Sequence, residues 1–190
     1  TTIYDLAAKQ LSSLGIHVNL GPVIEILTEE NKDFLDTRSF GDKERVSVYS
    51  AIFIESMLKN GVYPVVKHFP GNNADDPHLG LPVIDFDVER TKEVLLFPFD
   101  NIENKEEIGV LVAHSVVPAL FNKTEEPIPS CLSKTVVSNM LKNQLGYKGL
   151  IFSDDLLMAA LQSNGYESVE SISMAIKAGI NVLMIAQKEY

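Results

Sequence analysis

A short segment of the chain, residues 67–78, gathers groups that can move protons. It reads KHFPGNNADDPH and so contains one lysine, two histidines and two adjacent aspartates. Imidazole exchanges protons near neutral pH, and a carboxylate can orient its ring, so this set suits general acid–base chemistry on a polar substrate. Pro70, Gly71 and Pro77 disfavour a regular element. The segment is therefore predicted to be a loop that carries ionisable groups into a cleft.

Other polar residues stand directly behind apolar runs, and these runs must position them. Runs of Val, Ile and Leu without alternation predict strands covered on both faces, and hence a parallel sheet with helical crossovers. Such sheets bind ligands at the carboxyl ends of their strands. The runs are His17–Leu20 with Val23–Ile26 before a loop holding Arg38, Val62–Val66 before Lys67 and His68, Gly109–Ala113 before His114, Gly149–Phe152 before Asp154, and Ile180–Ala186.

Helical patterns fill the gaps between these runs. Thr2 and Ser133 are typical N-cap residues, and Gly61, Gly146 and Gly179 each stand where a left-handed residue commonly ends a helix. The alternation of strands and helices predicts an α/β fold. The predicted helices are Ile3–Leu14, Lys43–Asn60, Val88–Leu96, Ser133–Leu145 and Ser168–Ala178.

Composition limits the classes of function. The chain has 190 residues, 45% of them hydrophobic, and a net charge of -10, so one soluble domain is expected and a nucleic-acid partner is disfavoured. Cys131 is the single cysteine, which excludes a disulfide framework and a cysteine-based metal site. No apolar run reaches the roughly 18 residues that a membrane span requires.

Several motifs together resemble glycoside hydrolase family 3, and most of all its bacterial β-N-acetylhexosaminidase branch. The resemblance covers nearly the whole chain in order. The motifs are LGIHVNLGPV at 14–23, RSFG at 38–41, KHFPG at 67–71, DPHL at 76–79, AH at 113–114, IFSDDL at 151–156 and AGIN at 178–181. The resemblance implies one barrel domain over residues 1–190, of the TIM-type (β/α)8 class. About five strand–helix repeats are present, so the first strands and the last strand are expected outside this chain.

The resemblance also implies a reaction, the retaining hydrolysis of a terminal β-linked N-acetylglucosamine or glucose, typically on muropeptide fragments. Asp154 would be the nucleophile, and His78 the general acid/base, oriented by Asp76. Four residues would bind the sugar. They are Arg38, Lys67, His68 and His114. A carbohydrate is the expected partner, no metal or organic cofactor is implied, and the location implied is cytoplasmic, with an exported or lipid-anchored form left open.

The chemistry of these side chains supports the same assignments independently of the family resemblance. A retaining glycosidase needs a nucleophile and a group that first protonates the leaving oxygen and then deprotonates water. Histidine titrates near pH 6.5 and can serve both steps. Asp76 can accept from one ring nitrogen of His78, and cationic Lys67 favours an ionised, nucleophilic Asp154.

Each assignment has an alternative. His68 and His114 could be core histidines, Arg38 a surface residue, and Asp76 a turn residue. Asp155 could be the nucleophile by composition, although it is expected to cap a helix that starts at Leu156. The chain as a whole could be a non-catalytic partial barrel that binds sugar or assembles with another chain. Asn72-Asn73 departs from the family's usual His-Gly, and an open sheet edge predicts self-association.

Overall fold

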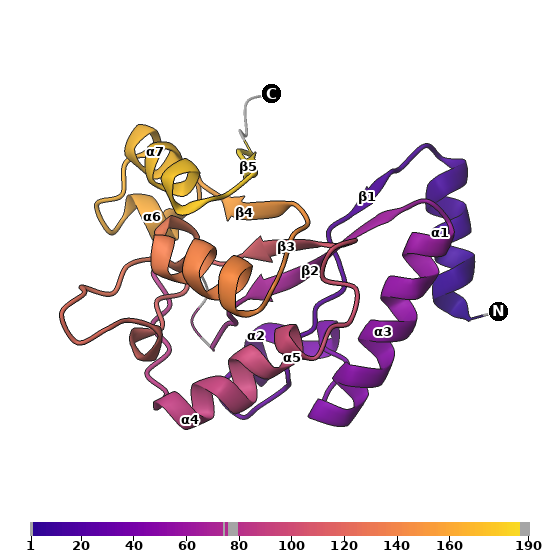
Figure 1. Ribbon diagram of the computed structural model, residues 1–190, viewed down its shortest axis with the longest axis horizontal. Helices are drawn as coiled ribbons and strands as arrows, with labels where there is room; N and C mark the ends of the chain where they lie inside the picture. The colour runs from indigo at the N-terminus through magenta and orange to yellow at the C-terminus, as the bar shows by residue number, and fades with distance from the viewer. Residues whose placement is uncertain (1, 74, 76–79, 187–190) are drawn as a thin grey trace.

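One parallel sheet organises the molecule, for which the computed structural model describes residues 2–73, 75 and 80–186. Within these residues the sheet has five strands, and each strand pairs with the strands next to it in the chain. The strands are β1 (Val18–Asn19), β2 (Tyr63–Phe69), β3 (Gly109–Val112), β4 (Ile151–Asp155) and β5 (Val182–Met184). They form a curled half-barrel (Figure 1), which confirms the α/β class and a partial TIM-type barrel.

Helices connect the strands, and Figure 1 shows α3, α4 and α5 together along one side of β2 and β3, with α1 beside α3. The side chains of Thr2 and Asp42 cap α1 and α3 as hydrogen-bond acceptors. The helices are α1 (Ile3–Ser13), α2 (Lys32–Leu35), η1 (Asp36–Arg38), α3 (Lys43–Lys59), α4 (Val88–Arg90), η2 (Thr91–Leu96), α5 (Phe97–Asp100), η3 (Pro118–Leu120), η4 (Ser130–Leu132), η5 (Thr135–Gln144), α6 (Ala159–Gln162) and α7 (Ser168–Ala178).

Several predicted boundaries are wrong, among them the end of the run Gly149–Phe152, which continues as β4 to Asp155. The strand predicted to end at Val66 continues to Phe69, because Lys67 pairs with Val23 on one side and Phe69 pairs with Val112 on the other. The run Val23–Ile26 contributes only that isolated pairing and forms no strand of its own. The helical segment beginning at Val88 extends through η2 and α5 to Asp100, since the residues at both junctions keep right-handed helical backbone angles.

The two faces of the sheet bury different sets of side chains. On one face Val66, Val110 and Ile151 join the main core, which includes side chains from α3, α5, η5 and α7. On the other face Val65, Leu111 and Phe152 form a separate small core with partly buried neighbours. Successive residues of a strand point to opposite faces, so these two cores account for the continuous apolar runs of the sequence.

The strands that carry the polar residues are irregular at their carboxyl ends. On β2, Val66 pairs with Val110 of β3, and the next pair is Phe69 with Val112. The chain therefore advances three residues on β2 and two on β3 between these pairs. Likewise β4 advances from Phe152 to Asp155 while β5 advances from Val182 to Met184. Such bulges redirect side chains and are common next to active sites. Both lie at the level of Lys67, His68 and Asp154.

The expectation that barrel strands lie before Thr1 and after Tyr190 is untested and stays a prediction. Within the described sheet β1 and β5 are the outer strands. Self-association through such an edge also stays a prediction. No helix among the described residues is both long enough and apolar enough to cross a bilayer.

Candidate active site

The carboxyl ends of three neighbouring strands bring Lys67 and His114 each within electrostatic reach of Asp154. Burial lowers the pKa of Lys67, and the negative charge of Asp154 opposes this shift. The cationic Arg38 lowers the pKa of Lys67 further, so the loop holding Arg38 lies near the same place. Two cations and one carboxylate from separate parts of the chain are thus gathered at one end of the sheet.

His114 is almost fully buried, and both of its ring nitrogens have protein partners. Nε2 lies 2.9 Å from the backbone oxygen of Asp155, and Nδ1 lies 3.2 Å from Sγ of Cys131. Burial lowers the pKa of His114. A neutral ring satisfies both contacts if Nε2–H donates to the carbonyl and Nδ1 accepts from the thiol. His114 therefore links η4 to the end of β4, and its predicted contact with a sugar is untested.

Cys131 supplies the other end of this link. Its side chain is completely buried, and burial raises the pKa of its thiol, as does the nearby charge of Asp154. A thiol that keeps its proton is a weak hydrogen-bond donor, which is what the unprotonated Nδ1 of His114 requires. The cysteine thus belongs to the structural support of the strand end.

Asp154 and Asp155 have different environments although they are adjacent. Oδ1 of Asp154 accepts from the backbone N–H of Asp155 at 2.9 Å. Oδ1 of Asp155 accepts from the N–H groups of Leu157 and Ala186, both at 3.1 Å. The prediction that Asp155 caps a helix starting at Leu156 is wrong: α6 begins at Ala159, and Asp155 instead closes a turn and ties it to the chain beyond β5.

Glu25 is a member of the site that the sequence analysis missed. Its carboxylate is 4% exposed and contacts two residues from other parts of the chain. Oε1 accepts from the backbone N–H of His68 at 3.2 Å and lies 2.7 Å from Nδ1 of the same residue. Oε2 accepts from the backbone N–H of Asn72 at 2.6 Å, and Nδ2 of Asn72 lies 3.1 Å from both oxygens. A lone acid inside an apolar run was the available signal, because buried carboxylates require partners.

Arg38 lies on the surface, in the loop that follows Glu25. Its Nη2 donates to the backbone oxygen of Phe34 at 2.9 Å, and its guanidinium lies 4.8 Å from the centre of the Phe34 ring. The loop is fixed at its root, since Ser39 Oγ donates to the backbone oxygen of Glu25 at 2.7 Å. The contact of Arg38 with a sugar stays a prediction.

Asp76 and His78, the predicted acid/base pair, lie outside the described residues. The residues on either side are held in place. Asn73 Nδ2 donates to Asp75 Oδ2 at 2.8 Å and to the backbone oxygen of Val83 at 3.0 Å. The backbone oxygen of Gly71 accepts from Ser115 Oγ at 2.7 Å. Gly71 is therefore tied to the chain that follows β3, and Asn73 is tied to Val83.

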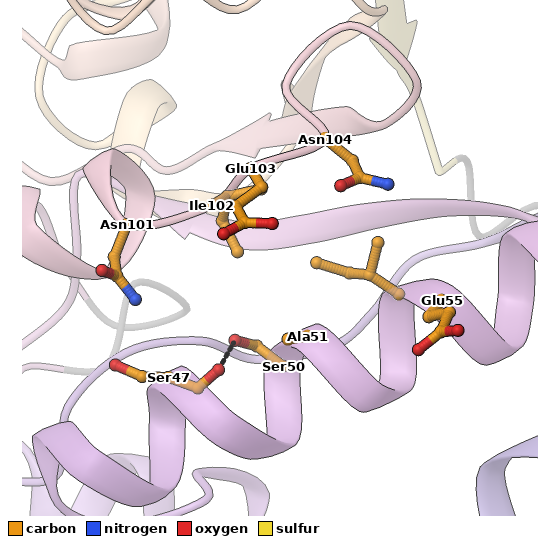
Figure 2. A pocket seen from close by; sticks show the side chains of 9 residues that line it. Ser47, Ser50, Ala51, Glu55, Asn101, Ile102, Glu103 and Asn104 are labelled. Carbon is orange, nitrogen blue, oxygen red and sulfur yellow. Dashed lines mark hydrogen bonds between the residues drawn. The ribbon is translucent and has the colours of Figure 1, made fainter.

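A separate cleft of about 500 Å³ lies away from these residues, between α3 and the segment 101–104 (Figure 2). Its walls carry hydroxyl, amide and carboxylate groups, but none of the polar residues of the strand ends lines it.

Among the described residues, no group of three or more His, Cys, Asp or Glu side chains is arranged to hold a metal ion. We therefore place the candidate site at the strand ends.

Comparison with known proteins identifies the family of the chain. The profile of the glycosyl hydrolase family 3 N terminal domain matches residues 2–190. The chain belongs to glycosyl hydrolase family 3. The beta-hexosaminidase LpqI of Mycobacterium tuberculosis is 31% identical to it, over 98% of this chain and 50% of that protein. Beta-hexosaminidase A of Pseudoalteromonas piscicida is 29% identical, over 97% of this chain and 33% of that protein.

A solved structure from the same family shares the fold. The family 3 β-N-acetylglucosaminidase from Paenibacillus sp. str. FPU-7 superposes with a TM-score of 0.87 at 29% identity, covering 96% of this chain and 34% of that one. This family 3 chain spans about half or less of the length of these relatives.

Proposed function

We propose that this family 3 chain carries the active site of a retaining glycosidase that releases terminal β-linked N-acetylglucosamine. One observation carries the proposal: Asp154 stands at the end of β4 within electrostatic reach of Lys67, in a chain whose relatives are named beta-hexosaminidases. A carboxylate at the end of a barrel strand near a cation is suited to nucleophilic attack on a sugar.

The reaction proceeds in two displacements. A carboxylate oxygen of Asp154 bonds to the anomeric carbon while the glycosidic bond breaks, and His78 gives its proton to the departing oxygen. His78 then takes a proton from water, whose oxygen displaces Asp154 from the anomeric carbon. Asp76 orients the ring of His78 through one nitrogen. Two inversions at one carbon leave the product with the configuration of the substrate.

The remaining residues hold the substrate and the nucleophile. Lys67, His68 and Arg38 hydrogen-bond the sugar hydroxyls. His114 acts through the backbone oxygen of Asp155, 2.9 Å from its Nε2, and so fixes the strand end that bears Asp154. Muropeptide fragments as the natural substrate, and a cytoplasmic site of action, rest on the family resemblance alone.

The test compares hydrolysis of 4-nitrophenyl β-N-acetylglucosaminide and β-glucoside by the intact protein and by Asp154→Asn. The exposed Asp33→Asn on α2 is the matched control, since it makes the same chemical change outside the site. We expect Asp154→Asn to lower kcat by at least about 1,000-fold and Asp33→Asn to leave it unchanged. NMR of the first product should detect the β-anomer.

Two results would contradict the proposal. An α-anomer as the first product would replace retention by inversion. A wild-type protein without turnover on either substrate would favour the non-catalytic partial barrel, and carbohydrate binding would then be the activity to measure.

A further inference from the structure

Glu25 occupies a position that packing alone would give to an apolar side chain. It stands between Ile24, which is fully buried, and Ile26, which is 9% exposed, and is itself 4% exposed. A carboxylate is expensive to bury unless donors surround it, and every contact of the Glu25 carboxylate described above comes from an N–H group or a ring nitrogen. Among the described residues, these donors belong to His68 and Asn72.

The contact with His68 selects one form of its ring. Because a carboxylate can only accept, Nδ1 of His68 must carry the proton that it shares with Oε1 across 2.7 Å. The backbone N–H of His68 donates to the same oxygen, so both the ring and its main chain are fixed against one acceptor. Among the described residues Nε2 has no hydrogen-bonding partner, which leaves that nitrogen for a ligand.

Asn72 in turn fixes the carboxylate of Glu25. Its side-chain amide lies 3.1 Å from both oxygens, and its backbone N–H donates to Oε2 at 2.6 Å. The chain can approach this closely because the preceding residue is Gly71, where a Cβ would lie 2.8 Å from Leu95 Cδ2 and 3.7 Å from Oε2 of Glu25. The carboxylate is thus clamped on the side away from His68.

We propose that Glu25, clamped by Asn72, is a positioning residue that holds the His68 ring with Nδ1 protonated and Nε2 available to a sugar hydroxyl. This inference rests on the proposed function only for the identity of the ligand. A carboxylate that accepts from one imidazole nitrogen fixes the tautomer and the orientation of the other, as in His–Asp pairs of hydrolases and at metal sites.

The first test reads the tautomer of His68 in the intact protein without substrate, by NMR of ¹⁵N-labelled histidine with His68→Gln for assignment. We expect the Nδ1–H form in the wild type, and loss of that preference in Glu25→Gln, whose amide replaces one acceptor by a donor. Thr91→Val is the matched control: its hydroxyl is equally buried and has no partner among the described residues. An Nε2–H ring in the wild type overturns the inference.

The second test is a double-mutant cycle on kcat/KM. Loss of a charge-assisted hydrogen bond corresponds to a decrease in kcat/KM of about 10- to 100-fold. We expect a decrease of this size for Glu25→Gln and for His68→Ala. If Glu25 acts through His68, adding Glu25→Gln to His68→Ala changes kcat/KM little further. If the decreases in kcat/KM of the two single variants multiply in the double variant, the inference is overturned, because independent effects are expected of a residue that only stabilises the fold.

The two proposals fail separately. If the wild-type protein hydrolyses no glycoside, the proposed function falls, and the tautomer spectrum alone decides the role of Glu25. Nδ1–H in the wild type and its loss in Glu25→Gln then support the positioning role, and an unchanged spectrum overturns it.

Discussion

The ammonium group of Lys67 on β2 and the carboxylate of Asp154 on β4 attract each other across the intervening strand β3. Burial lowers the pKa of Lys67, and the charge of Asp154 is the largest effect that opposes this shift. The pair is held by two strands that both contain a bulge at this level. The sheet thus places a desolvated cation near the proposed nucleophile.

Replacing this cation separates its effect on activity from its effect on the fold. Because burial disfavours the ammonium group, Lys67→Met should leave the unfolding temperature unchanged or raise it. The same change should lower kcat/KM by about 10- to 100-fold, since a charge-assisted hydrogen bond to substrate is lost. Glycoside hydrolysis and thermal unfolding measure the two effects, with exposed Lys59→Met as control. Parallel losses of activity and stability would argue for a purely structural lysine.

His114 should make the stability of the protein depend on pH. Burial lowers its pKa below the ordinary value of 6.5, so below that pH the unfolded chain binds a proton that the folded chain does not. The free energy of unfolding should therefore fall as the pH drops from about 7.5 to about 5.5. His114→Gln, which can donate to Asp155 but cannot titrate, should show a smaller fall in urea unfolding at the two pH values. Equal decreases in the free energy of unfolding in the wild type and in His114→Gln would show that His114 is not the source of this pH dependence.

The thiol of Cys131 should be unreactive in the folded protein. It is completely buried and burial raises its pKa, whereas thiol reagents require an accessible thiolate. Since it is the only cysteine of the chain, labelling by an aromatic disulfide reports on this site alone. We expect labelling in urea and none on the same timescale in native buffer. Rapid labelling without urea would show that the thiol is not enclosed next to His114.

Gly71 should tolerate no side chain. A Cβ at this position would lie 2.8 Å from Leu95 Cδ2, so Gly71→Ala should lower the free energy of unfolding by about 1–3 kcal/mol. Gly80→Ala is the matched control, because a Cβ there meets nothing within 4 Å. Urea unfolding compares the two variants. In a Leu95→Ala background, which removes the clashing methyl group, Gly71→Ala should cost less than it does in the wild type. Equal stability of the two glycine variants would exclude the clash.

The sequence predicted the parallel α/β fold because apolar runs and helix caps are local patterns. The predicted caps Thr2 and Ser133 each accept a hydrogen bond from the backbone N–H of the residue three positions later, Asp5 and Val136. Strand ends are less local: β2 passes Val66 because Val23 and Val112 offer partners to Lys67 and Phe69. A boundary that depends on residues from two other segments cannot be read from composition at the boundary itself.

The same reason explains why Glu25 was missed. Its partners His68 and Asn72 are 43 and 47 residues away in the chain, and the run Val23–Ile26 around it is otherwise apolar. Lys67, His68 and Asp154 could be named in advance because the motifs around them resemble those of glycosyl hydrolase family 3. The resemblance implied roles for residues expected to contact a ligand, whereas the contact of Glu25 with His68 is visible only in the folded chain.

The order of the strands in the sheet, β1 to β5, is also their order in the chain. Within the described sheet, each strand after β1 therefore pairs with a neighbour that was synthesised before it, and domains that fold during synthesis do so from the N-terminal side. Glu25, His68 and Asn72 all precede β4 in the chain. The residues that support the proposed sugar site are thus synthesised before the nucleophile that would use it.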